Sequence, residues 1–170
     1  MTVREMHPDE YHLRTDYFHR SSDEHLAMMG VDRSRLPPPD RWQAEYEREW
    51  ARPVRERALL ALAWVLDGAV VGFSTADRIV VGAEAFMHLH VIEPTLRGQG
   101  LGTGFVTQSA STYFRLLDLD HVYSEPYAYN VAPNRALQRA GFRYVVTHRP
   151  ELGPINVPGP TTRWVLERPD

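Results

Sequence analysis

Residues 85–104 read AFMHLHVIEPTLRGQGLGTG, and this stretch predicts a strand that leads through a glycine-rich turn into a helix. Its first half is mainly apolar and ends at Pro94, which is typical of a strand terminus. Glycine then takes every second position after Arg97, and apolar residues at helical spacing follow as far as Leu117. A turn of this kind places backbone N–H groups at a helix N-terminus, where they can bind phosphate.

Two well-known phosphate motifs do not fit this turn. The P-loop ends in Gly-Lys-Ser/Thr, and the turn contains no lysine. The dinucleotide fingerprint G-x-G-x-x-G requires a third glycine. That position holds Thr103 when counting starts at Gly98, and Phe105 when it starts at Gly100.

The pattern that fits is R-x-x-G-x-G, formed by Arg97, Gly100 and Gly102. It closely resembles the acyl-CoA-binding motif of the GNAT superfamily, the acyl-CoA-dependent N-acyltransferases, in which the loop amides hold the CoA pyrophosphate. Residues 130–142, NVAPNRALQRAGF, carry a second match, because the family has a strand followed by an Asn-initiated helix that ends in Gly-Phe. The resemblance covers roughly residues 58–148.

The resemblance implies a mixed α/β (α+β) fold with a mostly antiparallel central sheet, helices on both faces, and a splayed parallel strand pair that binds CoA. The sequence pattern agrees with this order of elements. Strands are expected over residues 3–6, 58–66, 70–81, 85–92, 122–127, 144–147 and 161–166. Helices are expected in the N-terminal region, over residues 99–117 and after Asn130. The length of 170 residues predicts one domain, residues 1–170.

The resemblance also implies acetyl-CoA or another acyl-CoA as co-substrate, and no metal. Pantetheine would lie between the splayed strands and pair with the backbone of the motif strand near His90. Carried over position by position, the CoA-binding residues are Val91, Ile92, Arg97, Gly98, Gln99, Gly100, Leu101, Gly102, Thr103, Asn130 and Asn134. In the family the amine attacks the thioester directly, without a covalent enzyme intermediate, and a backbone amide can stabilise the oxyanion.

His88 and His90 are the candidates for the group that accepts the proton of the amine. They stand two residues apart on the motif strand, so both side chains should face the same side, ~7 Å apart. An imidazole that titrates near neutral pH can take this proton directly or through water. Two buried histidines that bond to neighbouring backbone are the alternative. Glu84 and Glu125 are secondary candidates, and either can instead be a solvated or capping carboxylate.

The sequence departs from the family at the usual acid. Many members carry a tyrosine four residues before the glycine of Gly-Phe, and that position here is Leu137, which cannot donate a proton. Tyr127 and Tyr129 lie just before the Asn130 helix and could substitute, although strand tyrosines commonly serve packing. A thiolate leaving group could also take its proton from water.

Two alternatives to an acyltransferase stay open at this point. A non-catalytic acyl-CoA-binding sensor module of the same fold would carry the same CoA motif. A cupin-like metal enzyme is the other alternative, because His88-x-His90 followed by Glu93 resembles the first cupin motif and would suit iron or manganese. However, only two residues separate His90 from Glu93, whereas cupins have three or four, and the chain then turns helical.

Composition narrows the location and the partners. The net charge of −3 gives no basic footprint for nucleic acid. The absence of cysteine excludes disulfides and thiolate catalysis. The longest apolar run, residues 58–66, is far shorter than the ~20 residues that span a membrane, and the N-terminus does not read as a secretory signal. We therefore expect a cytoplasmic protein without membrane or nucleic-acid partners. Its acceptor would be a small-molecule or peptide amine, and a homodimer is compatible with the sequence.

Overall fold

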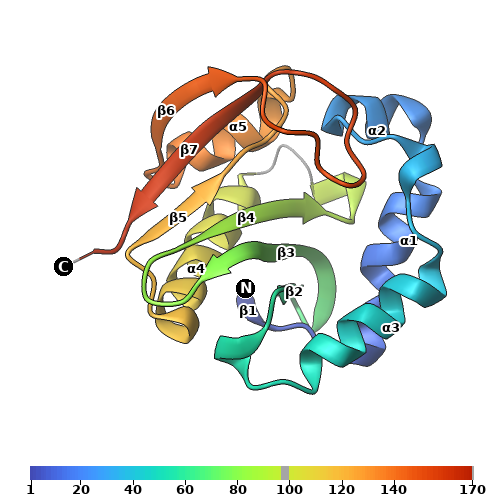
Figure 1. The fold of residues 1–170 in the computed structure, drawn as a ribbon, viewed down its shortest axis with the longest axis horizontal. Helices are drawn as coiled ribbons and strands as arrows, with labels where there is room; N and C mark the ends of the chain where they lie inside the picture. The colour runs from blue at the N-terminus through green and yellow to red at the C-terminus, as the bar shows by residue number, and fades with distance from the viewer. Residues whose placement is uncertain (97–99, 170) are drawn as a thin grey trace.

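The computed structural model describes residues 1–96 and 100–169, which form a seven-stranded sheet flanked by helices (Figure 1). The strands are β1 (Thr2–Glu5), β2 (Leu60–Leu66), β3 (Ala69–Val80), β4 (Glu84–Val91), β5 (His121–Ser124), β6 (Arg143–His148) and β7 (Thr161–Glu167). Their order is β1-β2-β3-β4-β5-β7-β6, and each neighbouring pair is antiparallel except β4 and β5. The mixed, mostly antiparallel sheet that the resemblance implied is confirmed.

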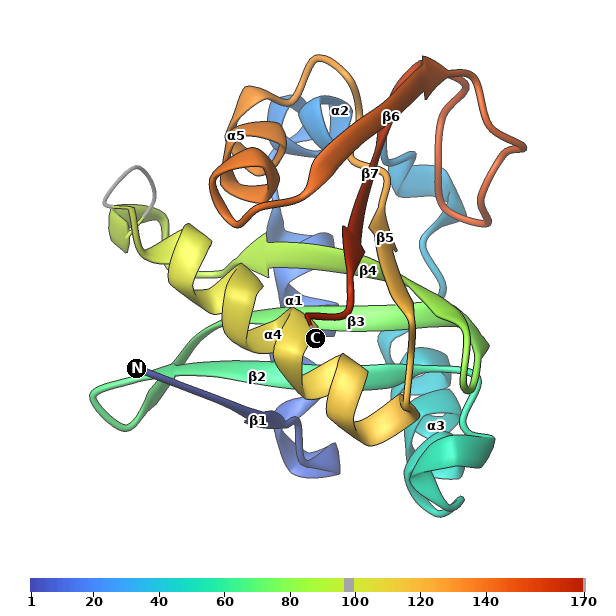
Figure 2. The ribbon, with the colours of Figure 1, turned by 90° about the vertical axis from the view of Figure 1, so that its left-hand side faces the viewer.

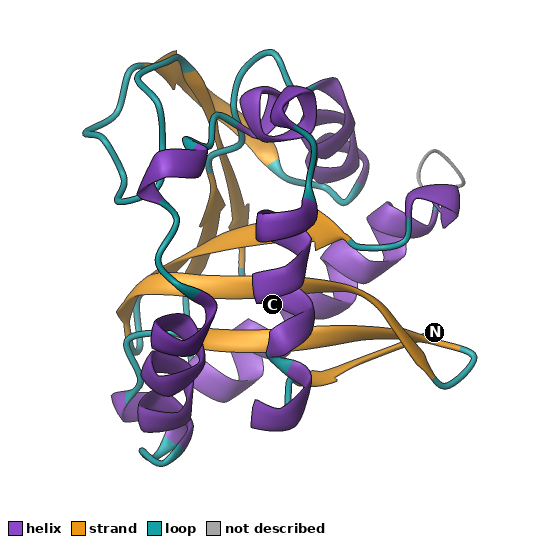
Figure 3. Ribbon diagram, turned by 90° about the vertical axis from the view of Figure 1, so that its right-hand side faces the viewer, coloured by secondary structure: helices purple, strands orange, loops and turns teal. Residues whose placement is uncertain are grey.

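Helices cover both faces of this sheet. They are α1 (His12–Arg20), α2 (Asp23–Met29), α3 (Pro39–Trp50), α4 (Leu101–Leu117) and α5 (Val131–Arg139). Figure 2 shows α4 and α5 on one face, and Figure 3 shows α1 and α3 on the other. Among the described residues, each helix is too short or too polar to cross a membrane.

Alternate residues of β2 enter two separate hydrophobic cores, because successive side chains of a strand point to opposite faces. Leu62 and Trp64 pack with Tyr113 of α4 in the first core. Ala63 packs with Trp42 of α3 in the second. A strand that is buried on both faces reads as a continuous apolar run, and the sequence of β2, LALAWVL, is such a run.

A chain of buried hydroxyl groups ties α4 to the sheet. Trp64 Nε1 donates a hydrogen bond to Ser109 Oγ at 2.8 Å, and Ser74 Oγ donates to the same oxygen at 3.1 Å. The Tyr113 hydroxyl lies 3.0 Å from Ser74 Oγ. Buried polar groups need partners at fixed positions. This chain therefore sets where α4 lies along β2 and β3.

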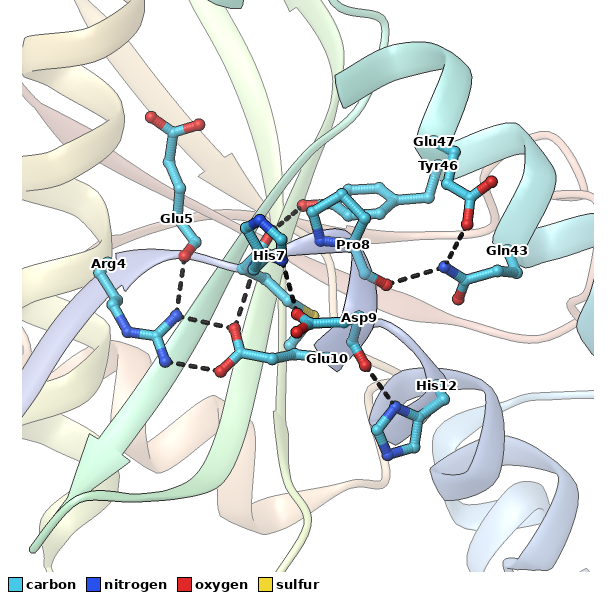
Figure 4. Close-up of polar contacts among 11 residues, drawn as sticks. Arg4, Glu5, His7, Pro8, Asp9, Glu10, His12, Gln43, Tyr46 and Glu47 are labelled. Atoms are coloured by element: carbon cyan, nitrogen blue, oxygen red, sulfur yellow. Dashed lines mark hydrogen bonds and ion pairs between the residues drawn. The ribbon is translucent and has the colours of Figure 1, made fainter. Parts of the chain in front are cut away.

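Polar contacts fasten the N-terminal strand to the helices beside it (Figure 4). The guanidinium of Arg4 donates to both carboxylate oxygens of Glu10, at 2.7 and 2.6 Å. The Glu10 carboxylate also accepts from the backbone N–H of His7 at 3.0 Å. From α3, the buried Tyr46 hydroxyl donates to the carbonyl of Met6. These bonds fix the edge of the sheet against α3.

β5 is shorter than the sequence predicted. A strand to Tyr127 was expected and is wrong, because β5 ends at Ser124. Pro126 has no N–H to donate to a strand ladder. The Ser124 hydroxyl donates to the carbonyl of Met87 at 2.7 Å, and Tyr127 makes only an isolated bridge to Thr161. The early end of β5 opens the sheet beside the second half of β4.

Candidate active site

β4 and β5 pair only over their first residues. The paired residues are Glu84 with His121, Ala85 with Val122, and Phe86 with Tyr123. β5 then ends, whereas β4 continues to Val91 and stays paired with β3 on its other side. Residues 87–91 thus have no ladder with β5, which is the splayed parallel pair that the resemblance implied. At its far end, the Ile92 N–H donates to Val71 O at 2.9 Å and so points toward β3.

The first turn of α4 has backbone donors at its N-terminus. Gly100 is the N-cap of α4 and has a φ of 80°, a left-handed conformation that favours glycine. Glycine has no side chain to accept the N–H groups of Leu101, Gly102 and Thr103 in the first turn, so these donors can meet an anion. The other predicted members of this turn, Arg97, Gly98 and Gln99, lie outside the described residues.

The two asparagines of the second motif have different surroundings. Asn130 is the N-cap of α5, but its side chain makes no capping hydrogen bond. Asn134 donates to the carbonyls of Asn130 at 2.7 Å and Tyr127 at 3.1 Å, and its own oxygen accepts from Trp164 Nε1 at 2.8 Å. Asn134 therefore holds the segment between β5 and α5 in place. Its predicted contact with CoA stays a prediction, as does that of Asn130.

His88 lies on the unpaired half of β4 and contacts a carboxylate that the sequence reasoning missed. His88 Nε2 is 3.1 Å from Asp77 Oδ1, in an electrostatic contact without hydrogen-bond alignment. Both side chains are partly exposed, at 38% for His88 and 43% for Asp77. Burial alone would raise the pKa of the Asp77 carboxyl group. The neighbouring His88 and Arg78 outweigh burial and lower that pKa. Asp77 is thus a carboxylate that can stabilise a protonated His88.

His90 occupies an aromatic environment instead. Its ring centroid lies 4.9 Å from that of Phe73, 5.0 Å from Phe18 and 5.2 Å from Tyr17. Phe73 is its direct partner on β3, as Thr75 is the partner of His88. The two histidines share a face, as predicted, and His88 contacts the carboxylate of Asp77.

A β-bulge in β3 explains why Asp77 and Arg78 were missed. The register between β3 and β4 shifts between Asp77 and Val80, and Arg78 has a φ of 48°. The bulge places two consecutive side chains on one face. Asp77 reaches His88, while the Arg78 guanidinium carbon lies 3.5 Å from the ring centroid of Phe86. The signal in the sequence was a charged pair inside an otherwise apolar strand.

Glu125, a predicted base, is held by two arginines and a histidine. Its carboxylate accepts from Arg163 Nε at 2.6 Å and from His148 Nε2 at 2.8 Å, and Arg78 lies 3.4 Å away. The side chain is only 5% exposed, and burial would raise the pKa of the carboxyl group, but the bonds from His148 and Arg163 outweigh burial and lower it. A carboxylate stabilised in this way is a weak base. Glu84 lies at the paired beginning of β4, away from the unpaired half.

The two candidate acids also differ. Tyr129 is 72% exposed, and its ring centroid is 5.6 Å from that of Tyr127. The Tyr127 ring packs against Gly30 and Gly159, where a larger residue would collide with it. Leu137, at the position of the usual tyrosine, is fully buried in the core beneath α5.

The loop between β6 and β7 lies against the N-terminal helices. The Val157 N–H donates to Gly30 O at 2.9 Å, and the Asp32 N–H donates to Ile155 O at 2.8 Å. This loop is therefore docked on the end of α2. Phe18 of α1 and Trp42 of α3 are buried in the core.

The cupin-like alternative is wrong. β4 leads into the helix α4 within a mixed α/β fold, whereas a cupin continues in strands. Over the described ranges, His, Asp and Glu side chains form no group of three or more that could hold a metal ion.

Comparisons with known proteins agree with this geometry. The family model described as "Acetyltransferase (GNAT) domain" matches residues 2–143. No curated relative matches the chain in sequence.

Solved structures of similar fold cover nearly the whole chain. A ribosomal-protein-S5-alanine acetyltransferase from Vibrio fischeri has a TM-score of 0.76 and 16% identity, over 97% of this chain and 91% of that one. A spermidine N-acetyltransferase from Vibrio cholerae, in complex with CoA and spermine, has a TM-score of 0.76 and 14% identity, over 98% and 94%. An aminoglycoside acetyltransferase in complex with coenzyme A and kanamycin has a TM-score of 0.73 and 16% identity, over 98% and 94%.

Proposed function

The chain belongs to the GNAT acetyltransferase family, and we propose that it moves an acyl group, with acetyl as the first choice, from acyl-CoA to an amine. Transfer would occur by direct attack of the amine on the thioester in a ternary complex. The observation that carries this proposal is the unpaired half of β4 beside the open first turn of α4. The unpaired half of β4 would offer backbone groups to pantetheine and to the developing oxyanion. The first turn of α4 would offer N–H groups to the pyrophosphate.

We propose His88 as the base. An attacking amine must be neutral, and it loses a proton as the new amide forms. His88 Nε2 faces Asp77, so Nδ1 is the nitrogen that would accept this proton. The Asp77 carboxylate would then stabilise the imidazolium. Asp77 acts through His88 and is a positioning residue.

Tyr129 is the proposed acid for the departing thiolate, because its side chain is exposed while Tyr127 is packed between two loops. Tyr129 also lies one residue before the Asn130 helix, on the segment that follows β5. Water is the other source of this proton.

The acceptor would be a small-molecule or peptide amine. The similar structures are named for aminoglycosides, spermidine and a ribosomal-protein alanine, which have an amino group in common. At 14–16% identity these names set only the chemical class to be tried first.

The experiment is a thiol-release assay with acetyl-CoA and longer acyl-CoAs against a panel of amines that includes all three acceptor types. We expect amine-dependent release of CoA with at least one acceptor. A variant with Gly100→Val serves as the control that lacks a functional CoA turn. Failure of the wild-type protein to bind CoA would refute the proposal.

One observation favours a second function. Leu137 is fully buried where the family often has its acid, so a sensor that binds acyl-CoA without turnover is the alternative. CoA binding without release against the whole amine panel, and without slow hydrolysis, is the result that would favour the sensor.

A further inference from the structure

Arg14 on α1 is a partly buried cation whose hydrogen-bonding groups are incompletely used. Its Nε and Nη1 atoms are buried and have no hydrogen-bond partner. The guanidinium carbon lies 4.2 Å from the ring centroid of Trp42 and 5.4 Å from those of Tyr11 and Phe18. Aromatic faces attract a cation but accept no full hydrogen bond in place of an oxygen atom. Each such orphaned donor in a folded protein requires an explanation.

The position is electrostatically unfavourable in the absence of an anion. Burial lowers the pKa of the Arg14 guanidinium, although Tyr11, Asp77 and Glu45 act in the opposite direction. A buried charge is ordinarily paired and hydrogen-bonded, because the loss of water is costly. No ion pair of Arg14 occurs among the described residues, so its charge is uncompensated at close range.

Arg14 lines a cavity of about 290 Å³ between α1, α3 and the start of β2. The two carboxylates of this cavity already have partners. Glu45 pairs with Arg41 at 3.0 Å, and Glu49 pairs with Arg52 at 3.2 Å and also accepts from the Ala58 N–H.

Arg48 is the second cation at the cavity wall, and it forms no ion pair in the part of the chain that the structure describes. Arg14 and Arg48 are therefore two cations without an ion pair among the described residues. Both carboxylates of the cavity, in contrast, are already paired with arginines that do not line it.

We propose that this cavity binds the carboxylate of a small organic acid. Arg14 would donate hydrogen bonds to the carboxylate, for which the planar guanidinium has the matching geometry. The rings of Tyr11 and Trp42 would contact the apolar part of the same molecule. The volume lies at the small end of the range for ligand pockets, which favours a compact aryl or alkyl acid.

This cavity is distinct from the proposed CoA turn at the start of α4. It adjoins the start of β2, which pairs with Ala76, the neighbour of Asp77 in β3, whereas the far end of β4 pairs with Gly72 farther along β3. It also lies on the face of α1 and α3, opposite to α4. Figure 2 shows α3 and the start of α4 at opposite sides of the molecule.

The test is binding of phenylacetate to the purified full chain by titration calorimetry, with neutral phenylacetamide as the matched probe. Arg14→Met keeps an unbranched apolar side chain and removes the guanidinium group. Arg20→Met, at an exposed position of the same helix, is the control variant. We expect phenylacetate to bind the wild-type and Arg20→Met proteins. Phenylacetamide should bind the wild-type protein about tenfold or more weakly than phenylacetate does, and phenylacetate should bind Arg14→Met more weakly by a similar factor, because each change removes one of the two charges. CoA affinity, measured on the same samples, should be unchanged, so the outcome is independent of the acyl-transfer proposal.

A second measurement covers the case in which Arg14→Met does not fold. The indole N–H resonance of Trp42 in the wild-type protein should shift with phenylacetate and not with phenylacetamide, because Trp42 stacks on Arg14. The proposal is overturned if neither phenylacetate, benzoate nor hexanoate binds at millimolar concentration, if Arg14→Met binds phenylacetate as the wild type does, or if only inorganic phosphate binds.

Discussion

His88 and Asp77 are the pair of side chains on which the proposed chemistry most directly depends. A histidine surrounded only by apolar groups would be a poor base, because nothing would stabilise its protonated form. The contact of 3.1 Å with Asp77 gives the protonated imidazole a partner, and the partial exposure of both groups lets an amine or a water molecule reach them.

We expect His88→Gln to lower kcat by about 10²-fold or more, with CoA affinity nearly unchanged, because a useful general base typically contributes this much. His90→Gln is the matched variant on the same strand and the same face. His90→Gln should weaken the packing against Phe73 but leave the acid limb of the pH–rate profile nearly unchanged. Steady-state rates and pH profiles of both variants decide this. Wild-type rates and an unchanged acid limb in both would place the base elsewhere.

Glu125 should make stability depend on pH. Its pKa in the folded protein is lowered below its ordinary value of 4.5, so its stabilising effect is fully present above that value. The effect is lost as the pH falls from about 4.5 through the lowered pKa of the folded state. At neutral pH, Glu125→Gln should lower the free energy of unfolding by about 2 kcal/mol, since charge-assisted hydrogen bonds are lost.

Denaturant unfolding of the wild type and Glu125→Gln at pH 7 and at acidic pH measures this difference. We expect the gap between the two proteins to narrow as the pH falls. A gap that stays constant down to the acid-unfolded state would contradict the ion-pair assignment.

At this scale the sequence predicted some positions and missed others. The alternation of β4 correctly placed His88 and His90 on one face. Asp77 and Arg78 escaped because a bulge breaks the alternation of β3, and one extra residue cannot be recognised from apolar and polar periodicity. The orphaned Arg14 could not be foreseen either, since its lack of partners depends on contacts between α1 and α3.

Among the elements, the turn into α4 is the one on which the proposed CoA binding most depends. Gly100 has a positive φ and open space around the position of an added Cβ. Among the described residues, no atom lies within reach of an added Cβ, so the cost there would be the strain of the left-handed backbone, about 1–2 kcal/mol. Relief of that strain would rearrange the first turn of α4 and its N–H groups.

Gly82 provides a matched control for this turn. Its φ of 81° nearly equals the 80° of Gly100, and it also has nothing near an added Cβ, but it lies in the turn before β4 at the opposite end of that strand. We expect Gly100→Val and Gly82→Val to lower Tm by similar amounts. Only Gly100→Val should weaken CoA binding by about tenfold or more, in line with the loss of charge-assisted hydrogen bonds. Equal CoA affinity in the two variants would show that the turn does not bind the pyrophosphate.

Local signals predicted most elements well. Asp67 and Gly68 have φ values of 50° and 84° and connect β2 to β3, as expected for an Asp-Gly hairpin. Ser22 caps α2 and Gly30 ends it in a left-handed conformation, and both residue types are common at these positions. The end of β5 was predicted too late, because the bond of Ser124 to Met87 is a tertiary contact without a local sequence signal.

For the whole molecule, the sheet order explains how structures of 14–16% identity reach TM-scores of 0.73–0.76 with this chain. The arrangement depends on apolar runs, turns and the early end of β5, which many sequences satisfy. It also leaves β6 as a free edge strand, with Tyr144, Val145 and Val146 exposed.

We expect β6 to mediate the homodimer that the sequence allows, because an exposed apolar edge is a template for pairing with a second copy. Val145→Lys with Val146→Lys should shift the protein to a monomer in light scattering coupled to size-exclusion chromatography. Met28→Lys, at another exposed apolar residue, is the control variant. A wild-type monomer at high concentration would contradict this expectation.

The buried hydroxyl chain from Trp64 to Tyr113 bears on how this molecule can evolve. It anchors α4, the helix that follows the proposed CoA turn, from inside the protein. Among the described residues its bonds join β2, β3 and α4, and α1, α2 and the β6–β7 loop take no part in them. Selection for a new acceptor can therefore alter one face while the grip on the donor is inherited unchanged. In a library selected for a different amine, accepted substitutions should accumulate around α1, α2 and that loop and be rare at Ser74, Ser109 and Tyr113.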